Sequence, residues 1–144
     1  MNLQDKLRAA QKQKIEAEKE KGSLFLAQNK LRPEVTELSS GIQYEIIKEA
    51  HGSTPSLNNT IKAHYRGSLL SGTEFDSSYK RNQPFSAKPT SLIKGWQEVI
   101  PMMPVGSIWK LWIPSELAYG DRGAGAIPPG ATLIFEIELL EIIN

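Results

Sequence analysis

The stretch that decides the fold is residues 118–135, AYGDRGAGAIPPGATLIF. A Tyr-Gly turn and a glycine-rich loop lead through an Ile-Pro-Pro-Gly step into a strand of alternating apolar residues. Glycine and proline cluster where a chain leaves regular structure, and loops on a rigid scaffold often carry binding residues. We therefore predict a loop that presents its backbone and the phenol of Tyr119 over a pocket.

Four stretches of the chain predict strands of one sheet. In two of them, residues 42–46 and residues 61–66, apolar and polar side chains alternate, which indicates strands with one face in water. The other two, residues 107–113 and residues 132–143, are richer in apolar residues and are expected in the middle of the sheet. In the last of these strands, one face is predicted to consist of Leu133, Phe135, Ile137 and Leu139.

A single short helix is predicted at residues 92–100, beginning near Lys94 and bounded by Pro101. One helix lying across one antiparallel sheet is an α+β arrangement. Within the helix, Trp96 directly follows Gly95, where the absence of a side chain lets another backbone come close. This step suits the floor of a pocket.

The N-terminal residues predict a long charged helix. Residues 2–29 are dominated by helix-forming residues, with lysine and glutamate pairs four positions apart. About 28 residues reach roughly 42 Å, so this helix is expected to project. Gly22 weakens it and is expected to mark a bend, and Pro33 is expected to end it and to uncouple it from the rest. The predicted division is a helix over residues 1–32, a linker over residues 33–40 and a domain over residues 41–144.

Composition excludes several classes of protein. The chain has 144 residues and no cysteine, which supports one domain with an appendage and excludes disulfides and thiolate chemistry. Residues 1–32 carry eight lysines or arginines against four acidic residues. Because acids alternate with these bases and Phe25 is the only aromatic residue there, a solvated helix face is favoured over a nucleic-acid site. No apolar run is long enough for a membrane span or a signal peptide. A cytoplasmic protein is expected, or a periplasmic one if a removed signal peptide preceded Met1.

The sequence offers few side chains that could act as acid or base catalysts or as metal ligands. The two histidines, His51 and His64, lie apart without cysteines, so metal and thiol-nucleophile sites lack ligands. A serine nucleophile would need His64 as its base, and the chain has no G-x-S-x-G elbow. The glycine-rich residues 120–125 match no phosphate-binding motif. What remains is a set of apolar side chains at element ends: Tyr65, Phe75, Phe85, Leu92, Ile93, Trp96, Tyr119, Ile127 and Phe135. From pattern alone, a pocket and a plain core are equally supported.

A pocket without a nucleophile, metal or acid/base pair suits a reaction whose barrier is conformational. Rotation about an Xaa-Pro bond breaks amide resonance over a barrier of roughly 18 to 20 kcal/mol. The planar amide is more dipolar than the twisted one, so transfer to an apolar pocket destabilises it more and lowers the barrier. No proton transfer and no cofactor are required.

Four segments in order resemble the FKBP-type peptidyl-prolyl cis/trans isomerases. They are Ala63-His64-Tyr65-Arg66-Gly67, the step from Gly72 to Ser78, Lys94-Gly95-Trp96, and the loop opened by Tyr119. The resemblance covers residues 41–144 and is more specific than any single motif. It implies an antiparallel half-barrel sheet wrapped around one short helix, here preceded by the long N-terminal helix. It also implies Xaa-Pro peptides and unfolded proteins as substrates, and rapamycin or tacrolimus as inhibitors.

The resemblance assigns a role to each site residue. The proline ring would be walled by Tyr65, Phe85 and Phe135, with Trp96 as the floor, and Phe75 would be a further substrate-binding residue. Leu92 and Ile93 precede the helix, and the Ile93 backbone would bond a ligand carbonyl. The catalytic residues would be Tyr65, Asp76, which accepts from the Tyr65 hydroxyl, and Tyr119, which donates to a substrate carbonyl. Ile127 would close one side.

Some features depart from the common family pattern. Ala87 replaces a second large residue, so that wall is expected to be more open and macrolide binding weaker. The loop from Tyr119 to Pro128 is about one residue shorter, and Asn58-Asn59 replace a Gly-Asp turn. Residues 20–45 resemble bacterial relatives of the macrophage infectivity potentiator type, but Met1 falls inside the equivalent helix, so a monomer without the dimerising part is expected. Two alternatives are a non-catalytic prolyl-peptide or client-binding module and a structural partner protein that uses the helix.

Overall fold

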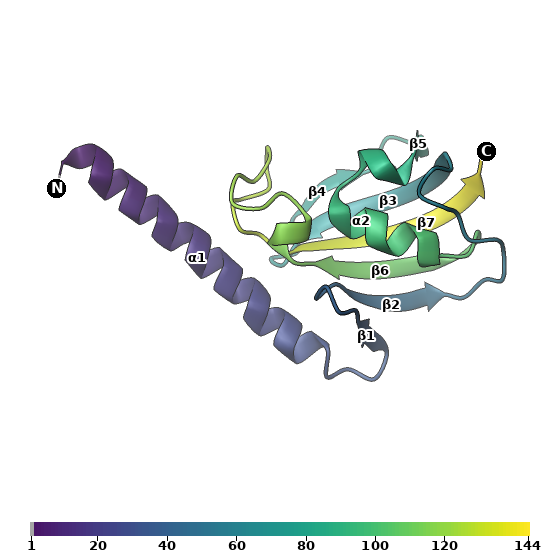
Figure 1. Ribbon diagram of the computed structural model, residues 1–144, viewed down its shortest axis with the longest axis horizontal. Coiled ribbons are helices and arrows are strands. Elements are labelled where there is room, and N and C mark those ends of the chain that lie inside the picture. The colour runs from purple at the N-terminus through teal and green to yellow at the C-terminus, as the bar shows by residue number, and fades with distance from the viewer. Residues whose placement is uncertain (1) are drawn as a thin grey trace.

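The computed structural model describes residues 2–144 as one sheet with two α-helices (Figure 1). The strands are β1 (Val35–Glu37), β2 (Gln43–Lys48), β3 (Ile61–Leu69), β4 (Glu74–Ser77), β5 (Phe85–Ala87), β6 (Ile108–Ile113) and β7 (Leu133–Ile142). The helices are α1 (Leu3–Asn29) and α2 (Lys94–Val99), with short 3-10 turns η1 (Pro89–Ser91), η2 (Ile100–Met102) and η3 (Ser115–Leu117).

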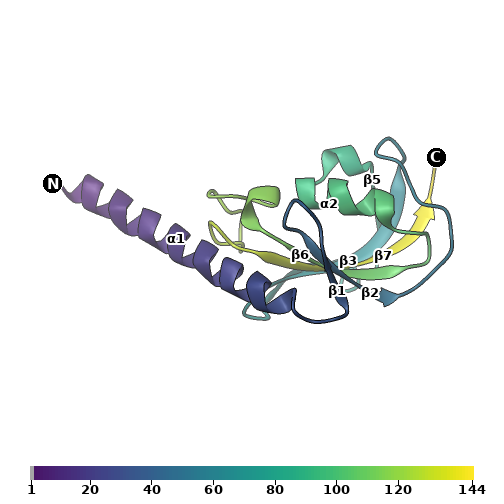
Figure 2. The ribbon, with the colours of Figure 1, turned by 60° about the horizontal axis from the view of Figure 1, so that its bottom comes forward.

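The strands form an antiparallel sheet in the order β1-β2-β6-β7-β3-β4, and β5 also pairs with β3. The last strand, β7, lies between β3 and β6 and buries one face, as predicted: Leu133, Phe135, Ile137 and Leu139. Figure 2 shows α2 on one face of the curved sheet, where the core lies. The predicted α+β half-barrel around one short helix is confirmed.

The face of β2 that was expected to meet water is covered. Gln43 is fully buried, whereas Ile46 is 47% exposed, so the alternation does not separate a dry face from a wet one. The reason is that the end of α1 lies over this strand. Nε2 of Gln43 donates to the Leu26 carbonyl oxygen at 2.8 Å, and Asn29 donates to Oε1 of Gln43 at 2.9 Å. A buried amide is retained here because its hydrogen bonds are made by the helix.

The long helix forms as predicted and projects over its first half. The Asn2 side chain caps α1 by accepting from the Asp5 amide at 2.8 Å. Residues 2–14 are all exposed, and this part extends away from the sheet in Figures 1 and 2. The expected bend at Gly22 is wrong, because α1 is continuous through this residue. Gly22 is instead buried, and a β-carbon there would lie 2.1 Å from Oγ1 of Thr132.

The expectation that Pro33 uncouples the helix is also wrong. Residues 33–40, predicted to be a linker, contain β1, which pairs with β2 at the edge of the sheet. Asn29, only 6% exposed, links the last turn of α1 to Gln43, and Arg32 forms an ion pair with Glu45 at 2.8 Å. The C-terminal half of α1 is therefore part of the packed structure, and only its beginning projects.

We predict that Asn29→Ala destabilises the whole fold. The substitution removes the donor to the buried Gln43 side chain, and an unsatisfied buried polar group costs about 1 to 3 kcal/mol. Urea unfolding should show a lower midpoint with an unchanged slope. The neighbouring exposed residue supplies the control, because Gln28→Ala removes an amide side chain from the same helix turn. Equal stability of the two variants would contradict the proposed coupling.

Candidate functional site

A cavity of about 450 Å³ opens between α2, the sheet and the loop that follows η3. Its lining residues are Tyr65, Phe75, Asp76, Phe85, Ser91, Leu92, Ile93, Trp96, Tyr119 and Phe135. Nine of the ten residues singled out from the sequence therefore meet around one hollow, although they come from six separate parts of the chain. The volume lies within the range of small-molecule sites, roughly 300 to 1,000 Å³.

Aromatic rings form most of the cavity wall, and they meet edge to face. The Trp96 ring lies 5.3 Å from that of Tyr65 at 81°, and 5.2 Å from that of Phe135 at 89°. Phe85 contacts the same indole at 5.9 Å, and Phe75 contacts Phe135 at 5.7 Å. Edge-to-face pairs at these separations are favourable because the positive ring edge meets the negative ring face. These contacts fix the orientation of the rings, which enclose an apolar cavity.

Trp96 lies at the bottom of this hollow because α2 packs directly on β6. A β-carbon on Gly95 would lie 2.6 Å from Cγ2 of Ile113, so only glycine permits this separation. The close neighbour is thus a side chain, not the backbone expected from the sequence. Trp96 is 4% exposed, and its indole N–H has no hydrogen-bond partner among residues 2–144. The floor of the cavity is apolar, and the unpaired N–H of Trp96 is buried.

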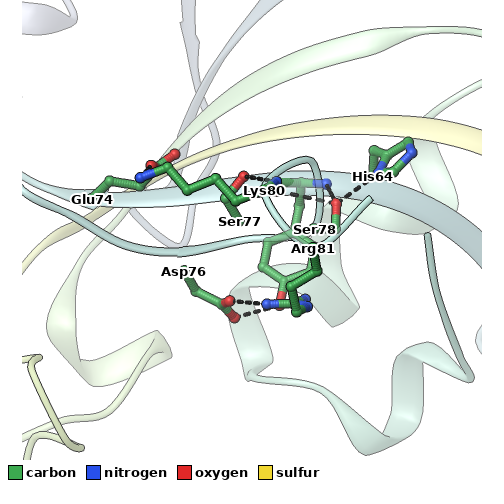
Figure 3. A network of polar contacts seen from close by, with 8 residues as sticks. His64, Glu74, Asp76, Ser77, Ser78, Lys80 and Arg81 are labelled. Atoms are coloured by element: carbon green, nitrogen blue, oxygen red, sulfur yellow. Dashed lines mark hydrogen bonds and ion pairs between the residues drawn. The ribbon is translucent and has the colours of Figure 1, made fainter. Parts of the chain in front are cut away.

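One carboxylate lies at the cavity edge within a network of polar contacts. The Tyr65 hydroxyl donates to Oδ2 of Asp76, and the Arg81 guanidinium donates to Oδ1 of Asp76 and, at 3.1 Å, to the Tyr65 hydroxyl. Figure 3 shows the carboxylate facing the guanidinium. Burial alone would raise the pKa of Asp76, but the bonds from Tyr65 and Arg81 hold this pKa below its usual value of 3.8. The carboxylate therefore stays charged and oriented.

The phenol of Tyr65 is correspondingly held in its neutral form. Burial raises the pKa of Tyr65 above its usual value, and the hydrogen bond to the Asp76 carboxylate raises it further, while Arg81 opposes this. Tyr65 thus remains a proton donor in the hydrogen bond rather than a base. The network orients polar groups at the rim and leaves no general base aimed into the cavity.

Arg81 is the site residue that the sequence analysis missed. It is five positions after Asp76, and a turn over residues 78–82 brings its side chain back to the carboxylate. Its guanidinium also lies 5.7 Å from the centre of the Tyr65 ring. The only sequence signal is an arginine shortly after the Phe-Asp-Ser-Ser step, and such a signal identifies no partner.

His64, the only histidine considered as a base from the sequence, meets a serine, Ser78, but outside the cavity. Nδ1 of His64 lies 2.8 Å from Oγ of Ser78, which also accepts from the Tyr65 amide at 2.7 Å. Ser78 is fully buried and neither residue lines the cavity. Figure 3 shows His64 beside Ser78, and their contact supports the backbone next to Tyr65. The His64 ring also stacks on that of Tyr79. A substrate has no access to this hydroxyl.

The loop after η3 brings Tyr119 to the mouth of the cavity and turns Ile127 inward. Tyr119 is 40% exposed and lines the cavity. Ile127 is 7% exposed and packs in the core, so the structure does not place it in the cavity wall where the resemblance implied it. Its backbone pairs with Ala124 inside the loop, which accounts for its inward position. Ala87 pairs with Ile61 in the sheet and does not line the cavity either.

Known families and proteins resemble this chain over most of its length. The sequence profile of FKBP-type peptidyl-prolyl cis-trans isomerase matches residues 52–140, and the profile of the domain amino terminal to FKBP-type peptidyl-prolyl isomerase matches residues 1–46. The FKBP-type 22 kDa peptidyl-prolyl cis-trans isomerase of Escherichia coli (strain K12) is 42% identical over 98% of this chain and 69% of the relative. Peptidyl-prolyl cis-trans isomerase Mip of Coxiella burnetii is 44% identical over 85% of this chain and 54% of the relative.

A solved structure gives the same picture. The crystal structure of FkpA from Escherichia coli superposes with a TM-score of 0.90 and 34% sequence identity, over 94% of this chain and 63% of that chain. The chain thus spans between about half and two thirds of the length of these relatives. Among residues 2–144, no helix has the length and apolar character needed to cross a membrane. Within the same residues, no three side chains of the metal-binding types come together.

We predict that the Asp76 carboxyl titrates below 3.8 and that Tyr65→Phe raises its pKa, because one of its hydrogen-bond donors is lost. A folded-state pKa that is lowered means that the carboxylate contributes stability above pH 3.8, and that this contribution is lost as the pH falls through the folded-state value. Carbon-13 NMR of the carboxyl group measures the titration directly. Tyr44→Phe, the same change on β2 and away from the cavity, is the control. An Asp76 pKa that is identical in all three proteins would contradict the network.

Proposed function

This chain belongs to the family of FKBP-type peptidyl-prolyl cis-trans isomerases, and from that premise we propose that it accelerates rotation about Xaa-Pro bonds in peptides and folding proteins. One observation carries the proposal: an apolar, aromatic-walled cavity of about 450 Å³ with polar groups confined to its rim. This is the arrangement expected of a site that binds a proline ring and twists the preceding amide without proton transfer.

The proposed mechanism is desolvation combined with selective binding of the twisted amide. In water, hydrogen bonds stabilise the planar amide, which is the more dipolar form. Inside the cavity, the edge-to-face rings around Trp96 offer no comparable solvation. The planar amide therefore loses more stabilising solvation on binding than the twisted amide does. Only interactions that favour the twisted state lower the barrier. The proline ring anchors the substrate so that the amide before it rotates in this environment.

Three rim groups are proposed to hold the peptide while it rotates. Tyr119 would donate its hydroxyl to a substrate carbonyl from the mouth of the cavity. The Ile93 amide, which precedes α2 and donates to no other group among residues 2–144, would bond a carbonyl beyond the proline. Asp76 stays charged through Arg81 and Tyr65, and its carboxylate would face the amide carbon as that amide loses planarity. Each group acts on the bound geometry, and none exchanges a proton with the substrate.

The second candidate is a prolyl-peptide or client-binding module that does not catalyse. The same apolar cavity supports it, because a hollow that binds a proline ring need not favour the twisted amide. The two functions differ at the rim. Catalysis depends on the polar groups that orient the flanking peptide bonds, whereas simple binding depends chiefly on the buried aromatic area.

We predict that the protein shortens cis-to-trans isomerisation of Xaa-Pro tetrapeptides, which takes tens of seconds or longer uncatalysed. Peptides with an apolar residue before proline should react fastest, because Leu92 and Ile93 line the mouth. Tyr119→Phe should lower kcat/KM about two- to tenfold, the loss expected for one neutral hydrogen bond. A protease-coupled or NMR exchange assay measures both values.

Tyr44→Phe is the matched control for this experiment, since it removes a phenol oxygen from a residue outside the cavity. Its kcat/KM should equal that of the wild type. A wild-type relaxation rate equal to that of buffer, together with measurable binding of the peptide, would establish the binding module instead.

We also predict competition between these peptides and rapamycin or tacrolimus, whose pipecolyl ring has the shape of proline. The pipecolyl ring should occupy the space between Tyr65, Phe85 and Trp96, and tryptophan fluorescence should report binding of the macrolide. Binding should be weaker than in relatives with a larger residue at position 87, because the Ala87 side chain stops short of the cavity and buries no apolar surface of the ligand. If high concentrations of macrolide neither change the fluorescence nor slow peptide turnover, the cavity does not accept the pipecolyl ring.

A further inference from the structure

We propose that α1 is a positioning element for the substrate loop, defined as residues 118–130, which carries Tyr119 to the mouth of the cavity. The helix contributes no residue to the cavity itself. Its effect would be exerted through the other side of the loop. The catalytic consequence of this inference rests on the proposed isomerase function, but the structural part does not.

The substrate loop has few constraints of its own. Between η3 and β7 it is held by turns, by the Ala124–Ile127 bridge and by the buried Ile127 side chain, and several of its residues are glycines with positive φ: Gly120, Gly123, Gly125 and Gly130. Glycine has more freedom in the unfolded and loop states than any other residue. Its ends are joined by one bond from the Gly130 amide to the Gly120 carbonyl oxygen, at 2.8 Å. A loop of this kind needs an external support to hold one side chain in one place.

The middle of α1 provides that support at three successive positions. Lys19 forms an ion pair with Asp121, two residues after Tyr119, with Nζ and Oδ1 2.7 Å apart. The other two contacts lie at the far end of the loop and just beyond it, at Gly130 and Thr132. A β-carbon added to Gly130 would lie 2.8 Å from the Ile15 carbonyl oxygen, and one added to Gly22 would lie 2.1 Å from Oγ1 of Thr132. In both places the glycine lets the helix come close to this part of the chain.

These three helix positions face the loop together because of their spacing. Residues 15, 19 and 22 are separated by four and three positions, which places them on one side of an α-helix. In Figure 1 the loop before β7 lies beside the middle of α1. The absence of a side chain at Gly22 allows the helix to approach the start of β7 directly. A glycine that is costly within a helix is thus explained by contact rather than by flexibility.

The helix can act as a support because it is itself fixed. Its last turn is linked to the sheet by the buried bond from Asn29 to Gln43, and β1 follows at once. A continuous helix transmits that anchorage over the four turns back to Ile15. Restricting the substrate loop lowers the entropy that must be lost when a peptide binds under Tyr119, and it places the hydroxyl where the substrate carbonyl arrives.

The expected effect of one contact is modest. Both members of the Lys19–Asp121 pair are substantially exposed, at 45% and 61%, and exposed ion pairs are weak. Lys19→Glu places like charges side by side and should therefore lower kcat/KM about two- to fivefold. The thermal midpoint should hardly change, because the helix remains anchored at Asn29.

The test uses the full chain and two independent readouts, amide hydrogen exchange of the substrate loop and kcat/KM for a tetrapeptide. We expect Lys19→Glu to raise the rate of amide hydrogen exchange in the loop and to lower kcat/KM. The double variant with the two charges swapped, Lys19→Glu with Asp121→Lys, should restore both the exchange rate and kcat/KM at least in part. Lys12→Glu makes the same charge change on α1, pairs with no carboxylate among residues 2–144, and should alter neither. Because Lys19 is on the surface, folding of this variant is not at risk.

Gly22→Ala gives a second, steric test. Alanine favours the helix by roughly 1 kcal/mol over glycine, yet its β-carbon would displace α1 from Thr132. A faster-exchanging loop in a variant with a better helix former would support positioning. Wild-type exchange in both Lys19→Glu and Gly22→Ala would overturn it, as would faster exchange with unchanged kcat/KM. A wild type without isomerase activity would refute the proposed function, while the exchange data would still decide whether α1 orders the loop.

Discussion

The close packing of α2 on β6 is the constraint on which the site depends. Gly95 allows the helix to rest against Ile113, and this contact sets how deeply Trp96 reaches into the sheet. Any larger residue at that position would lift the indole and with it the floor of the cavity. The surrounding rings then take their places edge to face on the indole, so one backbone separation determines the shape of the whole hollow.

The charged side chains of the site lie at the edge of this cavity and not inside it. Asp76 is the one acidic residue in the cavity lining, and Tyr65 and Arg81 hold it ionised and in place. The floor is the apolar face of the buried Trp96, and these surroundings solvate a dipolar amide poorly. An apolar interior with an ordered polar rim is what a conformational reaction requires, since the substrate must be desolvated at the rotating bond and held at its flanks. The proposed role of α1 extends the same principle to the loop that carries Tyr119.

Much of this arrangement follows from local sequence patterns. The alternation in residues 133–139 predicts the buried face of β7, and the Gly95-Trp96 step predicts the cavity floor, because both depend on neighbours along the chain. The errors arise where distant segments meet. Gln43 has the pattern of a wet position, and only the structure reveals that α1 covers it. Arg81 and the contact of Gly22 with Thr132 were missed for the same reason, since periodicity reports which face a residue is on and not what lies against that face.

The central claim is that a proline ring enters this aromatic cavity and that the preceding amide rotates there. Exchange NMR on a proline peptide in the presence of catalytic amounts of protein, combined with intermolecular nuclear Overhauser effects, tests both halves in one sample. The account predicts exchange cross-peaks between the cis and trans peptide on a timescale far shorter than the tens of seconds of the free peptide. It also predicts contacts from the proline ring protons to the rings of Trp96 and Phe135. Accelerated exchange with proline contacts only to residues outside the cavity would contradict it, and so would proline contacts in the cavity with exchange no faster than in buffer.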